Sequence, residues 1–278
     1  MPFRIVQSKQ NAHLKLLRQA LAGAMRQPGG LAGIEGPNLL AEALRAGLRI
    51  PTVFVAQGAE RLLDSLRLPP GTEILALPKA LLQSALATET PQPIAALVEP
   101  PEWTWAHFLG SSDAAPLAIV LAGLQDPGNL GTILRSAEAF GASGIIGLPG
   151  TVSAWNPKAV RASAGSVFRV PMLALTPGEC FEKLREAGVT LLGTMVREAQ
   201  PADRVDLGGP VALLIGNEGK GLPKELAAEA YCNVTIPCPG PVESLNAAVA
   251  ASILLYEASR QRSVHEVRPR ERRRGTQA

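Results

Sequence analysis

Short apolar runs alternate along the chain with segments that repeat their apolar residues at helical spacing. A basic amphipathic helix is predicted over residues 8–27, where leucines at helical spacing interleave with Lys15 and Arg18. Strands are predicted at Leu31–Glu35, Thr52–Ala56, Glu73–Leu77 and Ile94–Val98, with helices over residues 39–46, 59–66 and 79–87. Alternation of this kind predicts a small α/β domain over residues 1–100.

A second α/β pattern follows residues 99–115, which contain two prolines and two tryptophans. We interpret residues 101–115 of this stretch as a linker. We expect Trp103, Trp105 and Phe108 to pack this linker onto a domain surface. The continuous apolar run at residues 117–122 predicts a strand that is covered on both faces, as in a parallel sheet. Further strands are predicted near residues 144–148, 170–174, 190–194, 211–215 and 234–236.

The last predicted strand leads into a loop that contains Pro237, Pro239, Gly240 and Pro241. Proline withholds a ladder donor, so this stretch cannot continue as a packed strand. An Ala-rich helix follows, and Ser244 is placed to cap its first turn. Such a loop can wrap a small polar ligand, although an ordinary connection would have the same pattern.

Composition limits the class of protein. Of the 278 residues 46% are hydrophobic, yet no apolar run approaches the ~18 residues of a membrane span. The first ten residues lack the apolar region of a signal peptide, so a cytoplasmic location is expected. Three cysteines without paired spacing argue against a disulfide framework and against a zinc site. The net charge of +3 does not establish a nucleic-acid partner.

The C-terminal residues 263–278 are basic and are expected to be a disordered tail. Residues 268–274 carry five arginines and one glutamate. A solvated terminus and an RNA-contacting tail are equally compatible with this run.

Several common sites are excluded by spacing. The stretch GNEGKGL lacks the glycine separation and the hydroxyl residue of a phosphate-binding loop, and no dinucleotide fingerprint follows any predicted strand. A Rossmann-type dehydrogenase is therefore disfavoured. Ser244 has no hydrolase elbow around it, and the three histidines show no metal-ligand spacing, so no metal is expected.

Polar residues remain at three predicted strand ends: Asn129 with Arg135, Asn217 with Glu218, and Ser244 with Asn246. Ligands bind at the carboxyl ends of strands in open α/β sheets. Arg135 stands among apolar residues of a predicted helix. It is either a surface arginine paired with Glu138 or Asp126, or a cleft residue whose planar fork of donors suits a phosphodiester.

Together the three segments resemble the motifs of the SpoU (TrmH) family of RNA ribose 2′-O-methyltransferases. The matching stretches are NLGTILRSAEAFGA from Asn129, IGNEGKGL from Ile215, and IP…SLNAAVA from Ile236. The resemblance covers about residues 116–262. The first domain resembles, more loosely, the ribosomal-protein-like RNA-binding domain that precedes the catalytic domain in this family. Cys238 departs from the methionine that many members carry after Ile-Pro.

The resemblance implies a SPOUT-type parallel sheet with a deep trefoil knot over residues 116–262, which nothing in the residues themselves predicts. It implies S-adenosylmethionine as cofactor, bound by Thr194, Met195, Gly216, Ile236 and Leu245. It also implies a catalytic cluster and a homodimer with the active site near the interface. The cluster consists of Asn129, Arg135, Glu218, Ser244 and Asn246.

Arg135 is the family residue assigned to activating the ribose hydroxyl, but a guanidinium stays protonated above pH ~12 and is a poor base. We therefore expect it to clamp a phosphate and to stabilise the developing oxyanion. Ribosomal RNA is favoured over transfer RNA as substrate, because the arrangement of the first domain resembles that of rRNA-modifying members. A tRNA methyltransferase and a non-catalytic RNA-binding member are the alternatives.

Overall fold

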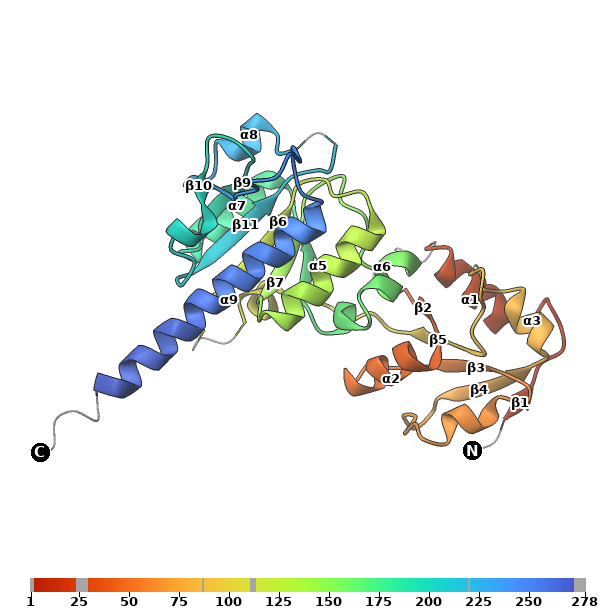
Figure 1. The fold of residues 1–278 in the computed structure, drawn as a ribbon. Coiled ribbons are helices and arrows are strands. Elements are labelled where there is room, and N and C mark those ends of the chain that lie inside the picture. Colours follow the sequence, from red (N-terminus) through yellow and green to blue (C-terminus); the bar gives the residue numbers. More distant parts are fainter. Residues whose placement is uncertain (1–2, 24–29, 87, 111–113, 220, 273–278) are drawn as a thin grey trace, which may run out of the picture. The chain divides into compact units, whose positions relative to one another are not determined.

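The structure is a computed structural model that describes residues 3–23, 30–86, 88–110, 114–219 and 221–272 (Figure 1). Its internal contacts divide the chain into two compact units. Unit 1 contains Met1–Glu102 and Ser153–Arg169, and unit 2 contains Trp103–Val152 and Val170–Ala278. Residues Ser153–Arg169 thus pack with unit 1, although they fall in the sequence range of the second predicted domain.

Unit 1 is built on a five-stranded sheet in the order β1-β4-β3-β5-β2. Its strands are β1 Arg4–Ile5, β2 Ala32–Glu35, β3 Thr52–Ala56, β4 Glu73–Leu77 and β5 Ile94–Val98. β3 runs parallel to β4 and antiparallel to β5. The helices are α1 Ala12–Leu21, α2 Pro37–Arg45 and α3 Lys79–Gln83, with α6 Pro157–Ala162 from the later segment. The four predicted strands of this domain are confirmed to within one residue.

Three helices of unit 1 are shorter than the sequence predicts, and one of them is α3, which ends at Gln83 instead of residue 87. The N-terminal helix begins after Asn11, whose side chain accepts hydrogen bonds from the backbone amides of His13 and Leu14. It ends at Leu21, before the predicted limit at residue 27, and Gly23 just beyond it adopts a left-handed φ of 72°, as is common after the last turn of a helix. The segment predicted as a helix over residues 59–66 is a single 3₁₀ turn, η1 Glu60–Leu63.

The segment that unit 1 takes from the later sequence is joined to α2 by an ion pair, in which Arg169 donates to Glu42 at 2.8 Å. Within the segment, Trp155 stacks on the buried Phe168. Gly165 allows this approach, because a Cβ there would lie 2.6 Å from the Glu42 side chain. A short helical segment is therefore built into the surface of unit 1.

Unit 2 contains a seven-stranded sheet in the order β10-β12-β9-β11-β6-β7-β8. All of its strand pairs are parallel. The strands are β6 Leu117–Leu121, β7 Gly144–Gly147, β8 Met172–Ala174, β9 Thr190–Thr194, β10 Gln200–Pro201, β11 Val211–Ile215 and β12 Cys232–Thr235. Every residue of β6 and β11 is buried, as the continuous apolar runs predict. The predicted parallel sheet is confirmed.

The helices of unit 2 include one that the sequence pattern did not indicate. They are α4 Trp105–Leu109, α5 Pro127–Ala139, α7 Pro177–Glu186, α8 Lys224–Ala227 and α9 Ala247–Arg272, with the 3₁₀ turn η3 Ala202–Arg204. A further 3₁₀ turn, η2 Ser166–Phe168, belongs to unit 1. α4 lies in the predicted linker and was missed because five residues are too few to show a helical period. The expected aromatic packing is confirmed for two of the three residues: Phe108 is fully buried in the core of unit 2 and stacks on Trp105 with 4.7 Å between ring centroids. Trp103 instead meets His107 of the same segment edge to face.

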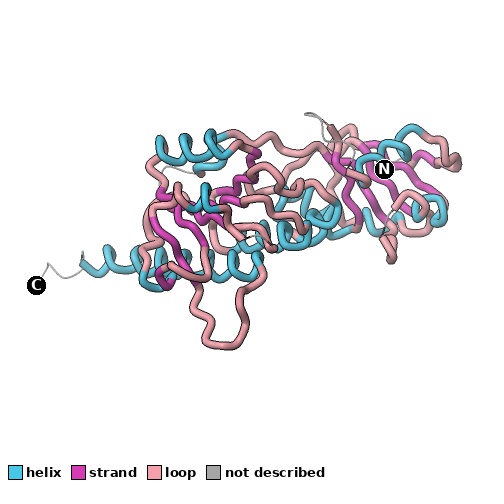
Figure 2. The backbone as a smooth tube through the Cα atoms, turned by 90° about the horizontal axis from the view of Figure 1, so that it is seen from above, coloured by secondary structure: helices cyan, strands magenta, loops and turns pink. Residues whose placement is uncertain are grey.

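Helix α9 packs along α5, and both helices lie over one face of the sheet in unit 2 (Figure 1). The Ser136 and Ser252 hydroxyls are hydrogen-bonded at 2.7 Å, and Phe140 meets Tyr256 edge to face. Both views show the C-terminal part of α9 extending beyond the sheet (Figures 1 and 2). The helix continues to Arg272, so the first ten residues of the expected disordered tail are helical, and residues 273–278 lie outside the described part.

Arg262, ten residues before the end of α9, ties this helix to the segments that precede β6 and β11. Its guanidinium donates to the backbone carbonyls of Ala115, Pro116, Leu207 and Gly209. Burial lowers the pKa of this guanidinium from its ordinary value. Among the described residues, no helix is long and apolar enough to cross a membrane.

Candidate functional site

The loops that follow β6, β9, β11 and β12 meet at one edge of the sheet in unit 2. All four strands are parallel neighbours, so their carboxyl ends lie on the same side. Three of these loops enclose a cavity of about 610 Å³. The cavity is lined by residues 194–196, 215–219, 221–222, 234–238 and 242–245, by Pro201, and by Ala247, Ala250 and Leu254 of α9.

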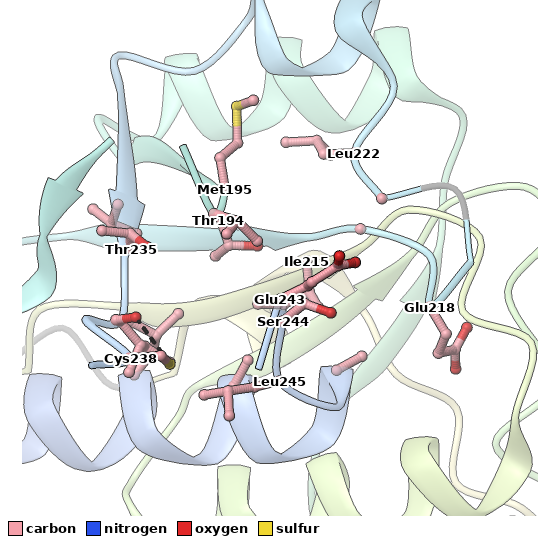
Figure 3. A pocket seen from close by; sticks show the side chains of 18 of the residues that line it. Thr194, Met195, Ile215, Glu218, Leu222, Thr235, Cys238, Glu243, Ser244 and Leu245 are labelled. Carbon is pink, nitrogen blue, oxygen red and sulfur yellow. Dashed lines mark hydrogen bonds between the residues drawn. The ribbon is translucent and has the colours of Figure 1, made fainter. Parts of the chain in front are cut away.

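All five residues predicted to bind a cofactor line this cavity: Thr194, Met195, Gly216, Ile236 and Leu245. Figure 3 shows Met195 and Leu222 on one side of the view and Leu245 on the other, with Ser244 between them. The Thr194 hydroxyl donates to the carbonyl of Leu214 at 2.8 Å, which ties the end of β9 to β11. The structure therefore gathers residues that are up to 51 positions apart.

Gly216 occupies a position that admits no side chain. A Cβ at this residue would lie 2.5 Å from the backbone carbon of Gly221 and from the backbone nitrogen of Leu222. The loop closes on itself here, because Asn217 and Gly221 exchange two backbone hydrogen bonds of 2.9 Å. The glycine is required by this tight loop.

The second site of interest is a chain of three side chains beside the cavity, which joins all three motifs. Nδ2 of Asn129, in the first turn of α5, donates to Oε1 of Glu218 at 3.0 Å. Oδ1 of Asn129 accepts from Nδ2 of Asn246 at 3.1 Å. Since each Asn129 atom is used once, the amide orientation is fixed by its two partners.

Hydrogen bonds favour the ionised form of Glu218. Burial by itself would raise the pKa of this carboxyl, but hydrogen bonds from Asn129 and from the backbone amides of Glu218, Gln125 and Asp126 outweigh it. The net result is a pKa below the ordinary value of 4.5. Glu218 is thus an anion that holds the loop after β11 against the start of α5.

Asn246, not Ser244, caps helix α9. Oδ1 of Asn246 accepts from the backbone amides of Ala248 at 2.9 Å and of Val249 at 3.2 Å. The predicted capping role of Ser244 is wrong, because the helix begins at Ala247, two residues later than that role requires. Ser244 is instead exposed and lines the cavity.

Arg135 is placed apart from the other predicted catalytic residues. It lies on α5 six residues beyond Asn129, which is about 9 Å along a helix axis. Its side chain is exposed, and no hydrogen bond or ion pair joins it to another residue in the described part of the chain. The predicted alternative, in which Arg135 pairs with Glu138 or Asp126, is therefore not found among the described residues.

Two further residues organise the site: Asp126, for which no capping role was predicted, and Asn217, which was singled out at a strand end but was not assigned to the catalytic cluster. Asp126 caps α5 by accepting from the backbone amide of Asn129 at 2.7 Å. Asn217 donates to the carbonyl of Gly123 at 2.8 Å and accepts from Gly219. The Asp-Pro pair before the glycine is a recognisable helix start and could have indicated Asp126. No group of three metal-ligating side chains occurs among the described residues.

Comparison with known proteins gives the chain a family. Residues 116–256 match the SpoU rRNA methylase family, and residues 11–96 match the MRM3-like substrate binding domain. A relative from Bacillus subtilis (strain 168), the 23S rRNA (guanosine(2553)-2′-O)-methyltransferase RlmP, is 33% identical over 227 residues, covering 80% of this chain and 86% of the relative.

Solved structures agree with this assignment over nearly the whole chain. The SpoU methyltransferase AviRb from Streptomyces viridochromogenes, in complex with AdoMet, has a TM-score of 0.79 and 31% identity over 91% of this chain and 99% of its own. An AdoMet-bound rRNA methyltransferase from Sinorhizobium meliloti has a TM-score of 0.80 and 31% identity over 93% of this chain and 98% of its own. The chain belongs to the SpoU rRNA methylase family, as its three motifs predict.

Proposed function

We propose that this protein transfers a methyl group from S-adenosylmethionine to a ribose 2′-hydroxyl of RNA, with ribosomal RNA favoured over transfer RNA. The observation that carries the proposal is the hydrogen-bonded chain from Glu218 through Asn129 to Asn246, which unites the three motifs beside the cavity. The named activity of the Bacillus subtilis relative supports the substrate class.

The cavity fits S-adenosylmethionine in size and in chemistry. About 610 Å³ is within the range of small-molecule sites, which are mostly apolar with a few polar groups. Ile236 and Leu245 offer apolar walls for the adenine, while backbone groups near Gly216 and the hydroxyl of Ser244 offer polar contacts. When bound, the cofactor supplies an electrophilic methyl group on a positively charged sulfur.

We assign the catalytic role to Arg135 and the positioning roles to the amide and carboxylate side chains. The 2′-oxygen gains negative charge as its bond to the methyl group forms and its proton leaves. A guanidinium can stabilise that charge and hold the neighbouring phosphate, and it does not lose its own proton near neutral pH. Asn129 and Asn246 orient the ribose, Glu218 fixes their loops, and Ser244 contacts the ribose or the cofactor.

Unit 1 is assigned to RNA binding. It contains the residues that match the substrate binding domain. On its helix α1, Lys15 is exposed and Arg18 is half-buried. Positive side chains contribute sequence-independent affinity for phosphates. The choice of ribosomal over transfer RNA rests on the relatives rather than on any base-reading contact.

We further propose a homodimer formed through α9. Val249, Ile253 and Tyr256 lie three or four residues apart and are 46%, 39% and 54% exposed, so they form one apolar stripe. Val242, at the edge of the cavity, is also exposed. Apolar stripes on helices are commonly covered by a second copy. The trefoil knot expected for the family is likewise a proposal, supported by the family's fold.

The experiment is methyl transfer from radiolabelled S-adenosylmethionine to RNA from a strain that lacks the gene, followed by mapping of 2′-O-methyl groups. Ribosomal and transfer RNA are tested separately, with RNA from the parent strain as the already methylated control. One new 2′-O-methyl group in ribosomal RNA is expected. Methylation confined to transfer RNA would support the alternative, and calorimetric binding of the cofactor without any transfer would favour a non-catalytic member.

A further inference from the structure

The cavity in unit 2 contains two carboxylates, and only one of them has a structural partner. Glu218 and Glu243 both line it, whereas no lysine or arginine does among the described residues. Glu218 is committed to Asn129 and to backbone amides. The Glu243 side chain has no hydrogen bond or ion pair to any residue in the described chain, and it is exposed to the cavity.

The backbone around Glu243 is held close to the cavity. Ser244 and Leu245, which follow it, both line the cavity, and the next residue, Asn246, is hydrogen-bonded to Asn129 and caps α9. Figure 3 shows the Glu243 carboxylate in the central space of the view, whereas Glu218 lies at the side on its own loop. An acidic side chain is therefore present at the cavity, and no lysine or arginine of the described ranges lines the cavity with it.

We propose that Glu243 is a specificity-determining residue that makes the cavity prefer S-adenosylmethionine over the demethylated product. This inference rests on the proposal that the cavity is the cofactor site. Methyl transfer breaks the bond between sulfur and methyl and leaves the electron pair on sulfur, so the sulfur changes from a cation to a neutral thioether. An unpaired carboxylate nearby attracts the first species and gains nothing from the second.

The same carboxylate is a poor partner for the other substrate. RNA is a polyanion, and a carboxylate facing a phosphate is repulsive. In a methyl-transfer site, the favourable partner of the Glu243 carboxylate is the positively charged sulfur of the cofactor, whose charge is lost in the reaction. Glu243 therefore strengthens binding of the cofactor before methyl transfer and adds nothing to the affinity of the product that must leave afterwards.

The expected size of the effect is modest, because Glu243 is exposed and solvent screens the interaction. Exposed ion pairs change a binding constant by about two- to fivefold. The test measures dissociation constants by calorimetry for wild-type protein, Glu243→Gln and the control Glu225→Gln. Glu225 is an exposed carboxylate on α8 that does not line the cavity. Its substitution therefore measures how much the loss of one negative charge elsewhere on the protein changes ligand affinity.

Three ligands separate the sulfur charge from the rest of the molecule: S-adenosylmethionine, S-adenosylhomocysteine, and sinefungin, which carries an ammonium in place of the methylsulfonium. Glu243→Gln is expected to weaken the first and third about two- to fivefold, less at high salt, and to leave the second unchanged. Glu225→Gln is expected to change none of them.

Equal weakening of all three ligands by Glu243→Gln would overturn the inference, because the carboxylate would then serve the amino-acid part that they share. Unchanged affinities would overturn it as well. Wild-type protein that binds none of the three would instead overturn the proposed function, and the inference with it.

Discussion

Nδ2 of Asn246 donates a hydrogen bond of 3.1 Å to Oδ1 of Asn129, across 117 residues of sequence. The same Asn246 side chain accepts from two backbone amides at the start of α9. One residue therefore both caps a helix and orients a neighbouring motif. This dual use means that its two roles can be separated by substitution.

Asn246→Ala is expected to destabilise the protein by about 1 kcal/mol, because α9 loses its cap. Asn246→Asp keeps an acceptor at the positive helix end but lacks the amide that donates to Asn129. Its stability in urea should stay near that of the wild type, while methyl transfer falls. Ser244→Ala is the control, since Ser244 does not cap the helix; a loss of stability with Ser244→Ala equal to that with Asn246→Ala would contradict the assignment.

Gly216→Ala is expected to abolish cofactor binding and to destabilise the protein by about 1–3 kcal/mol. Its Cβ would collide with the backbone at Gly221 and Leu222, which cannot rotate away. Gly219→Ala, three residues later, is the matched control, since its nearest neighbour would be Asn217 Oδ1 at 3.7 Å. Calorimetry with S-adenosylmethionine and urea denaturation measure the two effects. Equal tolerance of both substitutions would contradict the close approach.

The strands and the cavity residues could be predicted from sequence because they depend on local pattern. β3, β4, β5, β9 and β11 have the predicted limits to the residue, since buried strands read as apolar runs bounded by turn residues. The strand-end loops of unit 2 converge because the strands of its sheet are parallel. The family resemblance then selects which polar residues matter.

What could not be predicted depends on contacts between distant residues. Ser244 and Asn246 are equally good caps by residue type, and only the first residue of α9 decides between them. The attachment of residues Ser153–Arg169 to unit 1 depends on the approach of Glu42 to Gly165 and Arg169. The hydrophobic periodicity of a segment does not indicate which distant residue the segment will contact.

Glu218→Gln is expected to destabilise the protein at neutral pH and to have little effect in acid. The folded-state pKa of Glu218 is depressed below 4.5, so its ionised form contributes stability above the unfolded pKa. That contribution is lost as the pH falls from about 4.5 through the folded pKa. Because the side chain is exposed, the loss at pH 7 should not exceed about 1 kcal/mol.

Urea denaturation of wild type and Glu218→Gln at several pH values checks this prediction. The difference in unfolding free energy should be present at pH 7 and should shrink below pH of about 4.5. A difference that grows in acid would contradict the direction of the shift. Glu225→Gln, which alters an exposed carboxylate on α8, serves as the control.

Arg135→Ala is expected to reduce methyl transfer by about 10²-fold or more, as removal of one oxyanion-stabilising donor does elsewhere. Arg135 does not line the cavity and is exposed, so the dissociation constant of S-adenosylmethionine should not change. Arg135→Lys keeps the charge without the planar fork and should recover only part of the rate. Arg185→Ala is the control, because Arg185 is an exposed arginine on α7. An Arg135→Ala variant with wild-type activity would contradict the assignment of the catalytic role to Arg135.

Ile253→Glu is expected to convert a dimer into a monomer. Ile253 is the middle residue of the apolar stripe between Val249 and Tyr256 on α9, and a buried unpaired carboxylate would strongly disfavour the interface. Sedimentation at micromolar concentration should give twice the chain mass for wild type and the chain mass for the variant. Leu62→Glu is the matched control, since Leu62 is a comparably exposed apolar residue, 43% against 39%, on η1 of unit 1. A wild-type monomer, or dissociation by Leu62→Glu alone, would place the interface elsewhere or remove it.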